Sequence, residues 1–305
     1  MNTHSIKYLA QHQINKEKWD ACLDGSSNGL IYSYSFYLDA MSKHWDGLVL
    51  NDYEAVMPLT WNKKYGIYYL YQPFCCALLG ISGQFLHPAI TNDFLKHIPR
   101  VFRYWDICLN QGNNVNNDFF NAYKRKNFIL NLNQSYEKLY AKFSDNIKRN
   151  IKKAAQLNCS VNKPALAEVL NLAKIQMQQF ANVTDDDFIR FSNLYKFLEQ
   201  KNAATTYGII TANGNLLCAC VFFTWQNRAY YILAGNHPDS RSTGSSHMLI
   251  DAFIKDHSET NMILDFEGSD IPSLALFYSS FGAIEENYPG VRYNRLPSLI
   301  RWLKK

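Results

Sequence analysis

The chain has 305 residues, a formal net charge of +5 at pH 7, and a composition that is 47% hydrophobic and 15% aromatic. This length fits two domains of roughly 150 residues each, and the moderate, mixed charge excludes an intrinsically disordered chain. The charge is weaker than that of a dedicated nucleic-acid-binding module, so we expect no DNA partner.

The seven cysteines form no C-x-x-C pair, and the eight histidines show neither H-E-x-x-H nor another ligand spacing. We therefore expect neither a disulfide framework nor a metal site. Cys218 and Cys220 lie two apart in a predicted strand and should pack on the same side. The first 20 residues lack an apolar segment, and the apolar runs at 74–81 and 218–223 are too short to span a bilayer. These features predict a cytoplasmic protein without a membrane span.

Helix and strand patterns alternate along the first half of the chain. A strand is expected at 6–9, and Asn15 is placed to cap a helix that ends near residue 23. The other elements expected here are a helix at 36–43, strands at 48–50, 55–61 and 67–71, a helix at 94–98, a strand at 105–109, a helix at 119–125 and a strand at 128–132.

The second half repeats this kind of pattern. Ser144 should cap a helix that runs to residue 157, and the pairs Asn213-Gly214 and Gln226-Asn227 are hairpin signals. The other elements expected are a strand at 159–162, helices at 164–180 and 185–200, strands at 205–211, 216–225 and 229–234, a helix at 243–256, a strand at 262–266, a helix at 273–280, and strands at 283–288 and 291–296. Both halves thus predict a mixed α/β unit, and the polar stretch 131–135 divides the chain into domains 1–133 and 134–305.

A loop rich in small residues follows a strand and opens a helix in the second half. It consists of Arg241, Ser242, Thr243, Gly244, Ser245 and Ser246. Small residues let backbone N–H groups approach a diphosphate, and the helix N-terminus adds a positive potential. The alternative is an ordinary strand–helix loop in which Ser and Thr cap the helix.

Two carboxylates and a tyrosine come after this loop. Alternation along the strand places Asp265 and Glu267 on one face, where they could position an amine or accept its proton. A solvated strand end is the alternative. Tyr278 lies on a predicted helix whose Phe277 and Phe281 should face the core. Its phenol could protonate a leaving group, or it could simply be packed with a wet hydroxyl.

The helix that begins at Ser144 carries four cations on one side: Lys148, Arg149, Lys152 and Lys153. Ile147 and Ile151 form an apolar stripe beside them, so the helix is amphipathic. The cations could bind phosphates, and a solvated charged face is the alternative.

These residues resemble two segments of the GNAT acyltransferase superfamily. The loop from Arg241 to Ser246 resembles the GNAT loop that binds the pyrophosphate of acyl-CoA, and Phe277-Tyr278 with Gly282 resembles the F-Y-x-x-x-G segment, whose Tyr often protonates the departing thiolate. A longer resemblance is to the FemAB-like branch, the peptidoglycan bridge-forming transferases. Four pieces carry it: Ala55-Val-Met-Pro-Leu with Tyr71-Gln72-Pro73, the stretch from Ser144 to Lys153, the stretch from Asp265 to Ser269, and the stretch from Phe277 to Ala283.

The resemblance implies two GNAT-like units packed together, with a degenerate first unit on the acceptor side and a second unit that transfers the acyl group. It also implies that an amine attacks the ester or thioester directly, without a covalent enzyme intermediate. Residues 164–200 are filled by two ordinary helices, so we expect no helical-hairpin arm. The substrate-binding residues expected are Lys148, Arg149, Tyr71, Gln72, Asn236 and Ser269.

Our hypothesis is an N-acyltransferase in which the loop holds the donor's phosphates and the acyl group enters near Phe222 and Ile232. Asp265 or Glu267 would accept the amine's proton, and Tyr278 would protonate the leaving group. No tightly bound cofactor is expected. The donor is either acyl-CoA or an aminoacyl-tRNA, and the acceptor is a small-molecule amine or one of a cell-wall precursor. The alternative is a binding protein that kept the fold without the chemistry.

Overall fold

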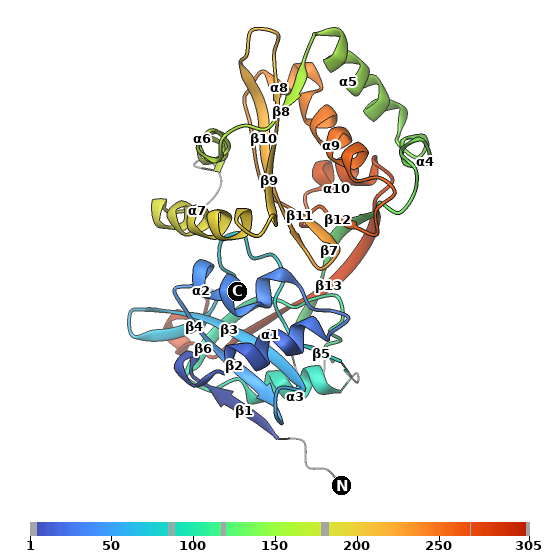
Figure 1. Ribbon diagram of the computed structural model, residues 1–305. Helices are drawn as coiled ribbons and strands as arrows, with labels where there is room; N and C mark the ends of the chain where they lie inside the picture. Colours follow the sequence, from blue (N-terminus) through green and yellow to red (C-terminus); the bar gives the residue numbers. More distant parts are fainter. Residues whose placement is uncertain are drawn as a thin grey trace. The chain divides into compact units, whose positions relative to one another are not determined.

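The computed structural model describes residues 5–84, 86, 89–116, 120–177, 183–268 and 270–302. The α/β chain divides into two compact units: unit 1 comprises Met1–Arg125 and Asn287–Lys305, and unit 2 comprises Lys126–Glu286 (Figure 1). The chain leaves unit 1 within β7 (Asn121–Asn131) and returns within β13 (Ile284–Asn294). This division differs from the expected boundary at 133/134, because the end of the chain rejoins the first unit.

Unit 1 has a mixed sheet with the strand order β1-β2-β3-β4-β6-β13. Its strands besides β13 are β1 (Ile6–Leu9), β2 (His44–Leu50), β3 (Ala55–Lys64), β4 (Ile67–Leu70), β6 (Phe102–Cys108) and the short β5 (Ser82–Gly83), which pairs with β3. Its helices are α1 (Lys16–Asp24), α2 (Ser35–Met41), α3 (Ile90–His97), α11 (Ser298–Arg301) and the 3-10 helices η1 (Gln11–Gln13) and η2 (Ile31–Ser33). Neighbours in this order run antiparallel except for β4 and β6, which run parallel.

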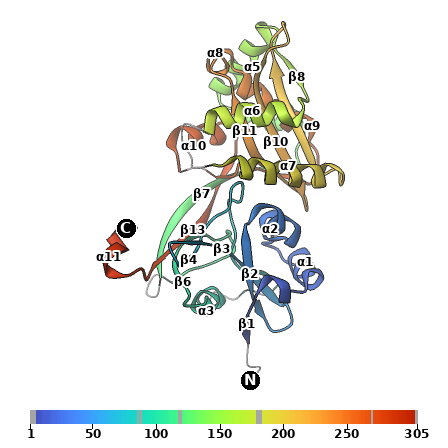
Figure 2. The ribbon, with the colours of Figure 1, turned by 90° about the vertical axis from the view of Figure 1, so that its left-hand side faces the viewer.

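Unit 2 has the strand order β7-β12-β11-β10-β9-β8. Its other strands are β8 (Ser160–Asn162), β9 (Ala204–Ile210), β10 (Leu216–Trp225), β11 (Arg228–Asn236) and β12 (Ile263–Asp265). Its helices are α4 (Tyr136–Ala141), α5 (Asp145–Gln156), α6 (Leu166–Met177), α7 (Asp185–Glu199), α8 (Ser240–Thr243), α9 (Ser245–Asp256) and α10 (Pro272–Ser279). In Figure 1, α6 and α7 cover one face of the sheet and α5, α9 and α10 lie on the other; Figure 2 shows α6 and α7 in front of the strands.

Local sequence signals account for many of these elements. The Asn15 side chain accepts a hydrogen bond from the Lys18 N–H at 3.0 Å and caps α1, and Ser144 caps α5 in the same way through Ile147. The turn between β9 and β10 uses Gly214 at φ +80°, a conformation that favours glycine. Cys218 and Cys220 both lie in the buried core of unit 2, as their spacing predicts.

Two expected elements take another form. Residues 121–125 of the helix expected at 119–125 instead begin strand β7, and residue 119 lies outside the described residues. The Tyr123 hydroxyl donates to Asp106 on β6 at 2.5 Å, which shows how tertiary contacts override the helix preference of this segment. The two strands expected at 283–288 and 291–296 are one continuous strand, β13.

The segment between β8 and β9 holds α6 and α7, which have 12 and 15 residues in the part that is described. None of the helices in the described ranges has the length and apolar character needed to cross a membrane. The described residues also contain no group of three or more His, Cys, Asp or Glu side chains that could hold a metal ion.

Candidate functional site

The sheet of unit 2 has an opening between two neighbouring strands, β11 and β12. β11 and β12 run parallel and pair at Arg228 with Ile263, Ala229 with Leu264, and Tyr230 with Asp265. β12 ends there, but β11 continues to Asn236, so its last residues have no partner strand on that side among the described residues. The peptide groups along this edge can therefore pair with an extended ligand.

A β-bulge lies beside the opening. The pairing of β10 with β11 passes from Val221–Leu233 to Phe222–Tyr231, so Ile232 has no partner in β10. A bulge re-aims the backbone of its strand and is over-represented next to active sites. This is the place where we expected an acyl group to enter, between Phe222 and Ile232.

The small-residue loop is more sharply bent than expected. The helix expected at 243–256 is divided into α8 and α9 by Gly244, which has φ +79°. A Cβ at Gly244 would lie 2.3 Å from the Asn150 carbonyl oxygen on α5. Both the backbone conformation and the close approach of α5 therefore require glycine at this position.

The hydroxyl groups of this loop are engaged locally. Ser242 donates to the Asp239 carbonyl at 3.1 Å and Thr243 donates to the Ser240 carbonyl at 3.0 Å, while Ser246 donates to the Asn236 amide oxygen at 2.7 Å. Asn236 also donates to Gln176 on α6 at 3.3 Å, so it ties the end of β11 to α6 and α9. Most of the first N–H groups of α9 are also engaged: Ser245 donates to the Thr243 hydroxyl at 3.4 Å, and His247 and Met248 donate to the Gly244 carbonyl at 3.1 and 3.2 Å. Among the described contacts the Ser246 N–H has no acceptor, so it is the backbone donor that could receive an anion.

α5 packs against α8 and α9 through a face that includes the buried Ile147 and Ala154, and its four cations lie on the other sides of the helix. Lys148 donates to the Ala141 carbonyl at 3.2 Å, and Arg149 donates to the Asn146 amide oxygen at 2.8 Å. Within the described residues, five cations of this region form no ion pair with a carboxylate: Lys148, Arg149, Lys152, Lys153 and Arg241. Their charge is thus available to an anionic ligand.

The two carboxylates do not share a strand face. β12 ends at Asp265, and Glu267 has φ +66°, so the expected alternation does not reach Glu267. The Asp265 side chain is 1% exposed. Its Oδ2 accepts from the Arg228 Nε at 2.7 Å, and its Oδ1 accepts from the Asn127 amide and the Glu267 N–H, each at 2.9 Å. Both oxygens of Asp265 are therefore occupied.

Tyr278 lies near the C-terminal end of α10 and contacts Phe266, the residue that follows β12. Its ring stacks on Phe266 with centroids 4.7 Å apart, and its side chain is 8% exposed. The contacts of the described residues include no hydrogen bond to its hydroxyl. Burial and the nearby Glu267 carboxylate raise the pKa of Tyr278 to about 12. The phenol is therefore protonated at neutral pH, and Phe277 and Phe281 pack against each other at 5.2 Å as expected for one helical face.

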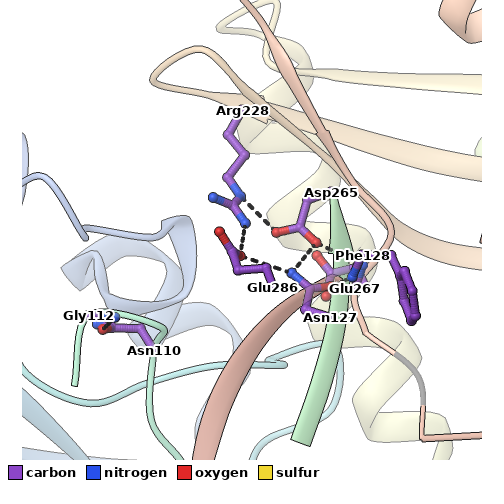
Figure 3. Close-up of polar contacts among 8 residues, drawn as sticks. All are labelled: Asn110, Gly112, Asn127, Phe128, Arg228, Asp265, Glu267 and Glu286. Carbon is purple, nitrogen blue, oxygen red and sulfur yellow. Dashed lines mark hydrogen bonds and ion pairs between the residues drawn. The ribbon is translucent and has the colours of Figure 1, made fainter. Parts of the chain in front are cut away.

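Four residues of this region carried no recognised signal in the sequence. Arg228, Asn127 and Glu286 join Asp265 in one polar cluster (Figure 3). The fourth, His247 in the first turn of α9, has a buried Nδ1 with no hydrogen-bond partner among the described residues, and it packs edge-on against Phe277 at 5.1 Å. Arg228 follows the turn Gln226-Asn227, where only the turn itself was recognised.

The remaining expected substrate-binding residues are Tyr71, Gln72 and Ser269. Tyr71 and Gln72 lie in unit 1. Gln72 donates to the Ala77 carbonyl at 3.0 Å and accepts from the Cys108 N–H at 3.2 Å, so both ends of its amide serve internal contacts. The Tyr71 hydroxyl accepts from the Lys43 N–H at 3.4 Å. Ser269 lies outside the described residues.

Solved structures share this fold at low sequence identity. The crystal structure of FemX matches with a TM-score of 0.66 and 12% identity, over 98% of this chain and 100% of FemX. L-PGS from Bacillus licheniformis has a TM-score of 0.52 and 10% identity, and the C-terminal domain of a putative lysylphosphatidylglycerol synthetase from Agrobacterium fabrum has 0.53 and 9%. The match to L-PGS covers 93% of this chain and 93% of L-PGS, and the match to the synthetase domain covers 94% and 93%. No protein-family model and no curated protein matches the sequence. The likenesses show the fold alone, and they confirm that the chain has an α/β fold like that of FemX, as the resemblance to the FemAB-like branch predicts.

Proposed function

We propose that unit 2 is an N-acyltransferase that moves an acyl or aminoacyl group from a phosphate-bearing donor to a primary amine. The observation that carries this proposal is the open edge of β11 beyond Tyr230, with a bulge at Ile232. An extended donor arm can pair with this edge as an added strand would. The backbone N–H groups at the bulge would then lie near the carbonyl oxygen that becomes negative during attack.

The surroundings of the opening support a donor with phosphates. The first turn of α9 lies at one end of the opening, where Ser246 bonds to Asn236, and the helix dipole and the cations on the exposed sides of α5 add positive potential to this part of unit 2. Arg241 is exposed and adds to it. Both a CoA pyrophosphate and the phosphates near the end of a charged tRNA have this chemistry, so the same site serves either class.

The reaction proposed has one bond-forming step and balanced proton transfers. The amine nitrogen attacks the carbonyl carbon, and the carbon–sulfur or carbon–oxygen bond to the donor breaks. Glu267 takes the proton from the amine, and Tyr278 gives its proton to the departing thiolate or alkoxide. The proton on Glu267 then returns Tyr278 to its neutral form, directly or through water. Asp265 is not the base in this scheme, because both of its oxygens are already occupied.

The acceptor proposed is a primary amine on a small molecule. A cell-wall precursor is the acceptor class implied by the resemblance to peptidoglycan bridge-forming transferases. A binding protein without chemistry is the rival function, and donor binding distinguishes the two.

Calorimetry with acetyl-CoA and then with an aminoacyl-tRNA tests the donor site. We expect one of them to bind and the double variant Arg149→Glu/Lys153→Glu to weaken that binding at least about tenfold, the effect of about 1.4 kcal/mol. Lys196→Glu/Lys201→Glu is the matched control, since it makes the same charge change on and just after α7. Binding of neither donor would favour the rival function.

Turnover with the donor that binds tests the chemistry. Panels of primary amines would be assayed by mass spectrometry of the acylated product. We expect Glu267→Gln and Tyr278→Phe each to lower kcat by about 10²–10⁴, the usual contribution of a general base or acid. If both variants turned over like the unmodified protein, these roles would be wrong even though the donor binds.

A further inference from the structure

A closed polar cluster lies directly behind the proposed base. Arg228 donates through Nε to Asp265 at 2.7 Å and through Nη2 to Glu286 at 2.8 Å, and the Asn127 amide donates to both carboxylates at 2.9 and 3.3 Å (Figure 3). The four side chains come from β7, β11, β12 and β13. Arg228 is 9% exposed and Asn127 and Asp265 are 1% exposed, so the cluster is largely shielded from water.

One member of the cluster is bonded to the backbone of the proposed base. Asp265 Oδ1 accepts the Glu267 N–H at 2.9 Å, and Glu267 has the left-handed φ of +66°. A non-glycine residue adopts this conformation at a cost of order 1–2 kcal/mol, so it persists where surrounding contacts hold it. The hydrogen bond from Glu267 to Asp265 is such a contact. It turns the chain at the end of β12 and places the Glu267 carboxylate close enough to raise the pKa of Tyr278.

We infer that Arg228 is a positioning residue: it fixes the Asp265 carboxylate, which in turn holds Glu267 in the conformation needed to accept a proton. This inference rests on the proposed role of Glu267. A guanidinium suits the task because its planar donors bond two carboxylates at fixed angles, which a lysine ammonium does not. The Asn127 amide completes the set by filling the remaining direction on Asp265 Oδ1.

A single cation, Arg228, balances the two carboxylates of the cluster. Asp265 and Glu286 both face Arg228, and this attraction outweighs the effect of burial, so the pKa of Arg228 lies above its ordinary value. Removing the guanidinium would leave two carboxylates together in a buried place. Glu267 itself bonds through its N–H to Asp265, and its carboxylate acts on Tyr278 of α10. The other charged groups of this part of unit 2 are Arg228 on β11 and Glu286 on β13, which bond to each other, and Asp270, which accepts the Lys126 N–H.

Two measurements on Arg228→Gln test the inference, one without substrate and one with it. Amide hydrogen exchange followed by NMR reports on the Glu267 N–H, and we expect it to exchange at least about tenfold faster in the variant, the effect of losing one hydrogen bond. In turnover, we expect kcat to fall by about a hundredfold, as for a misplaced catalytic group, with the KM for the donor unchanged. The acid limb of the kcat profile should also move to higher pH, because losing a cation makes it harder for Glu267 to lose its proton.

Four further variants sharpen the test. Arg190→Gln breaks an exposed i,i+4 pair with Asp186 in the same unit and should change none of these readouts. Arg228→Lys keeps the charge but not the fork, so it should retain the position of the acid limb and lose most of kcat. Asp265→Asn keeps an oxygen that can accept the Glu267 N–H, so it should speed amide exchange at Glu267 less than Asp265→Ala does. This pair of variants replaces Arg228→Gln if that variant does not fold.

The two ideas fail differently. Unchanged exchange at Glu267 in Arg228→Gln, or an unmoved acid limb with unchanged kcat, would overturn the positioning role while acyl transfer by the unmodified protein still stood. Faster exchange at Glu267 in a protein that transfers no acyl group would support the structural link and overturn the proposed function.

Discussion

Among the described strands each unit contains one parallel pair, β4 with β6 in unit 1 and β11 with β12 in unit 2, but the space beyond that pair is closed in unit 1 and open in unit 2. In unit 1, β4 ends at Leu70, and the chain returns so that Leu79 pairs with Leu109 beyond β6. The Leu79 N–H donates to the Cys108 carbonyl at 2.9 Å, and Gln72 accepts the Cys108 N–H. In unit 2, no described segment takes the corresponding place along β11 after Tyr230.

Buried amide side chains complete the closure in unit 1. Asn28, Asn110 and Asn113 all donate to the Ile81 carbonyl, at 2.9, 3.1 and 2.8 Å, and Asn113 also accepts the Ile81 N–H at 2.8 Å. These amides satisfy the backbone of a segment that has little regular structure. The difference teaches that one strand arrangement can serve as a sealed core or as a ligand edge, depending on whether the chain itself fills the gap.

The largest effect should come from removing Asn113, one of the three amides that bond the Ile81 backbone in unit 1. Asn113→Ala removes two buried hydrogen bonds and leaves the Ile81 N–H unpaired, which should destabilise unit 1 by about 3 kcal/mol. Donor affinity of the folded protein should be unchanged, because the donor site lies in unit 2. Urea unfolding and calorimetry would check the two expectations. A loss of donor affinity at full folding would show that the amide cluster of unit 1 and the donor site of unit 2 do not act separately.

The next effect should come from the bend at Gly244 in unit 2, which separates α8 from α9. Gly244→Ala places a Cβ 2.3 Å from the Asn150 carbonyl and forces alanine to φ +79°, so it should cost about 2–3 kcal/mol and weaken donor binding. Gly214→Ala is the control. Gly214 has φ +80°, and a Cβ added there would meet no atom within 4 Å, so only the backbone cost of about 1 kcal/mol applies. Equal losses in the two variants would mean that the approach of α5 does not matter.

A smaller effect on stability should appear at high pH, since Tyr278 in unit 2 titrates there and the amides of Asn28, Asn110 and Asn113 in unit 1 do not. Its pKa of about 12 lies above the unfolded value of 10.0, so its contribution to stability is complete below pH 10 and is lost as the pH rises towards 12. The loss is about 1.4 kcal/mol per pH unit, and Tyr278→Phe should remove it. Urea midpoints at pH 8, 10 and 11 would measure it, with exposed Tyr65→Phe as the control. A decline equally steep in Tyr278→Phe would contradict the assignment.

The sequence was sufficient to predict most of unit 2 because its signals are local. Asn213-Gly214 sets a hairpin, Ser144 caps a helix through its own third neighbour, and Gly244 lies in a run of small residues between a strand and a helix. The helical position of Tyr278 could be predicted for the same reason, since its neighbours Phe277 and Phe281 mark one face of a short helix. Such features depend on residues within one or two turns of each other.

The features that the sequence did not predict depend on residues that are far apart in the chain. Asp265 looked available because nothing nearby reveals that Arg228, 37 residues earlier, occupies one of its oxygens. Glu286 lies 58 residues after Arg228, and no local pattern links them. The strand at 121–125 was expected as a helix for a related reason: its Tyr123 is held by Asp106 on another strand. Pairings of this kind follow from the folded sheet and not from spacing.

The smallest effect is a loss of unfolding free energy at mildly acidic pH, which we expect from His247 in unit 2 and not from the amide cluster of unit 1. His247 lines the region beside Phe277, whereas the amides of Asn28, Asn110 and Asn113 do not ionise. Burial lowers the pKa of His247 below the unfolded value of 6.5, so the unfolded chain binds the proton more readily and stability is lost as the pH falls below 6.5. His247→Leu should therefore lose less unfolding free energy between pH 7 and 5 than the unmodified protein, measured by urea unfolding at both pH values. The same substitution at exposed His12 is the control. Parallel losses in His247→Leu and the unmodified protein would place the acid sensitivity elsewhere than at this opening.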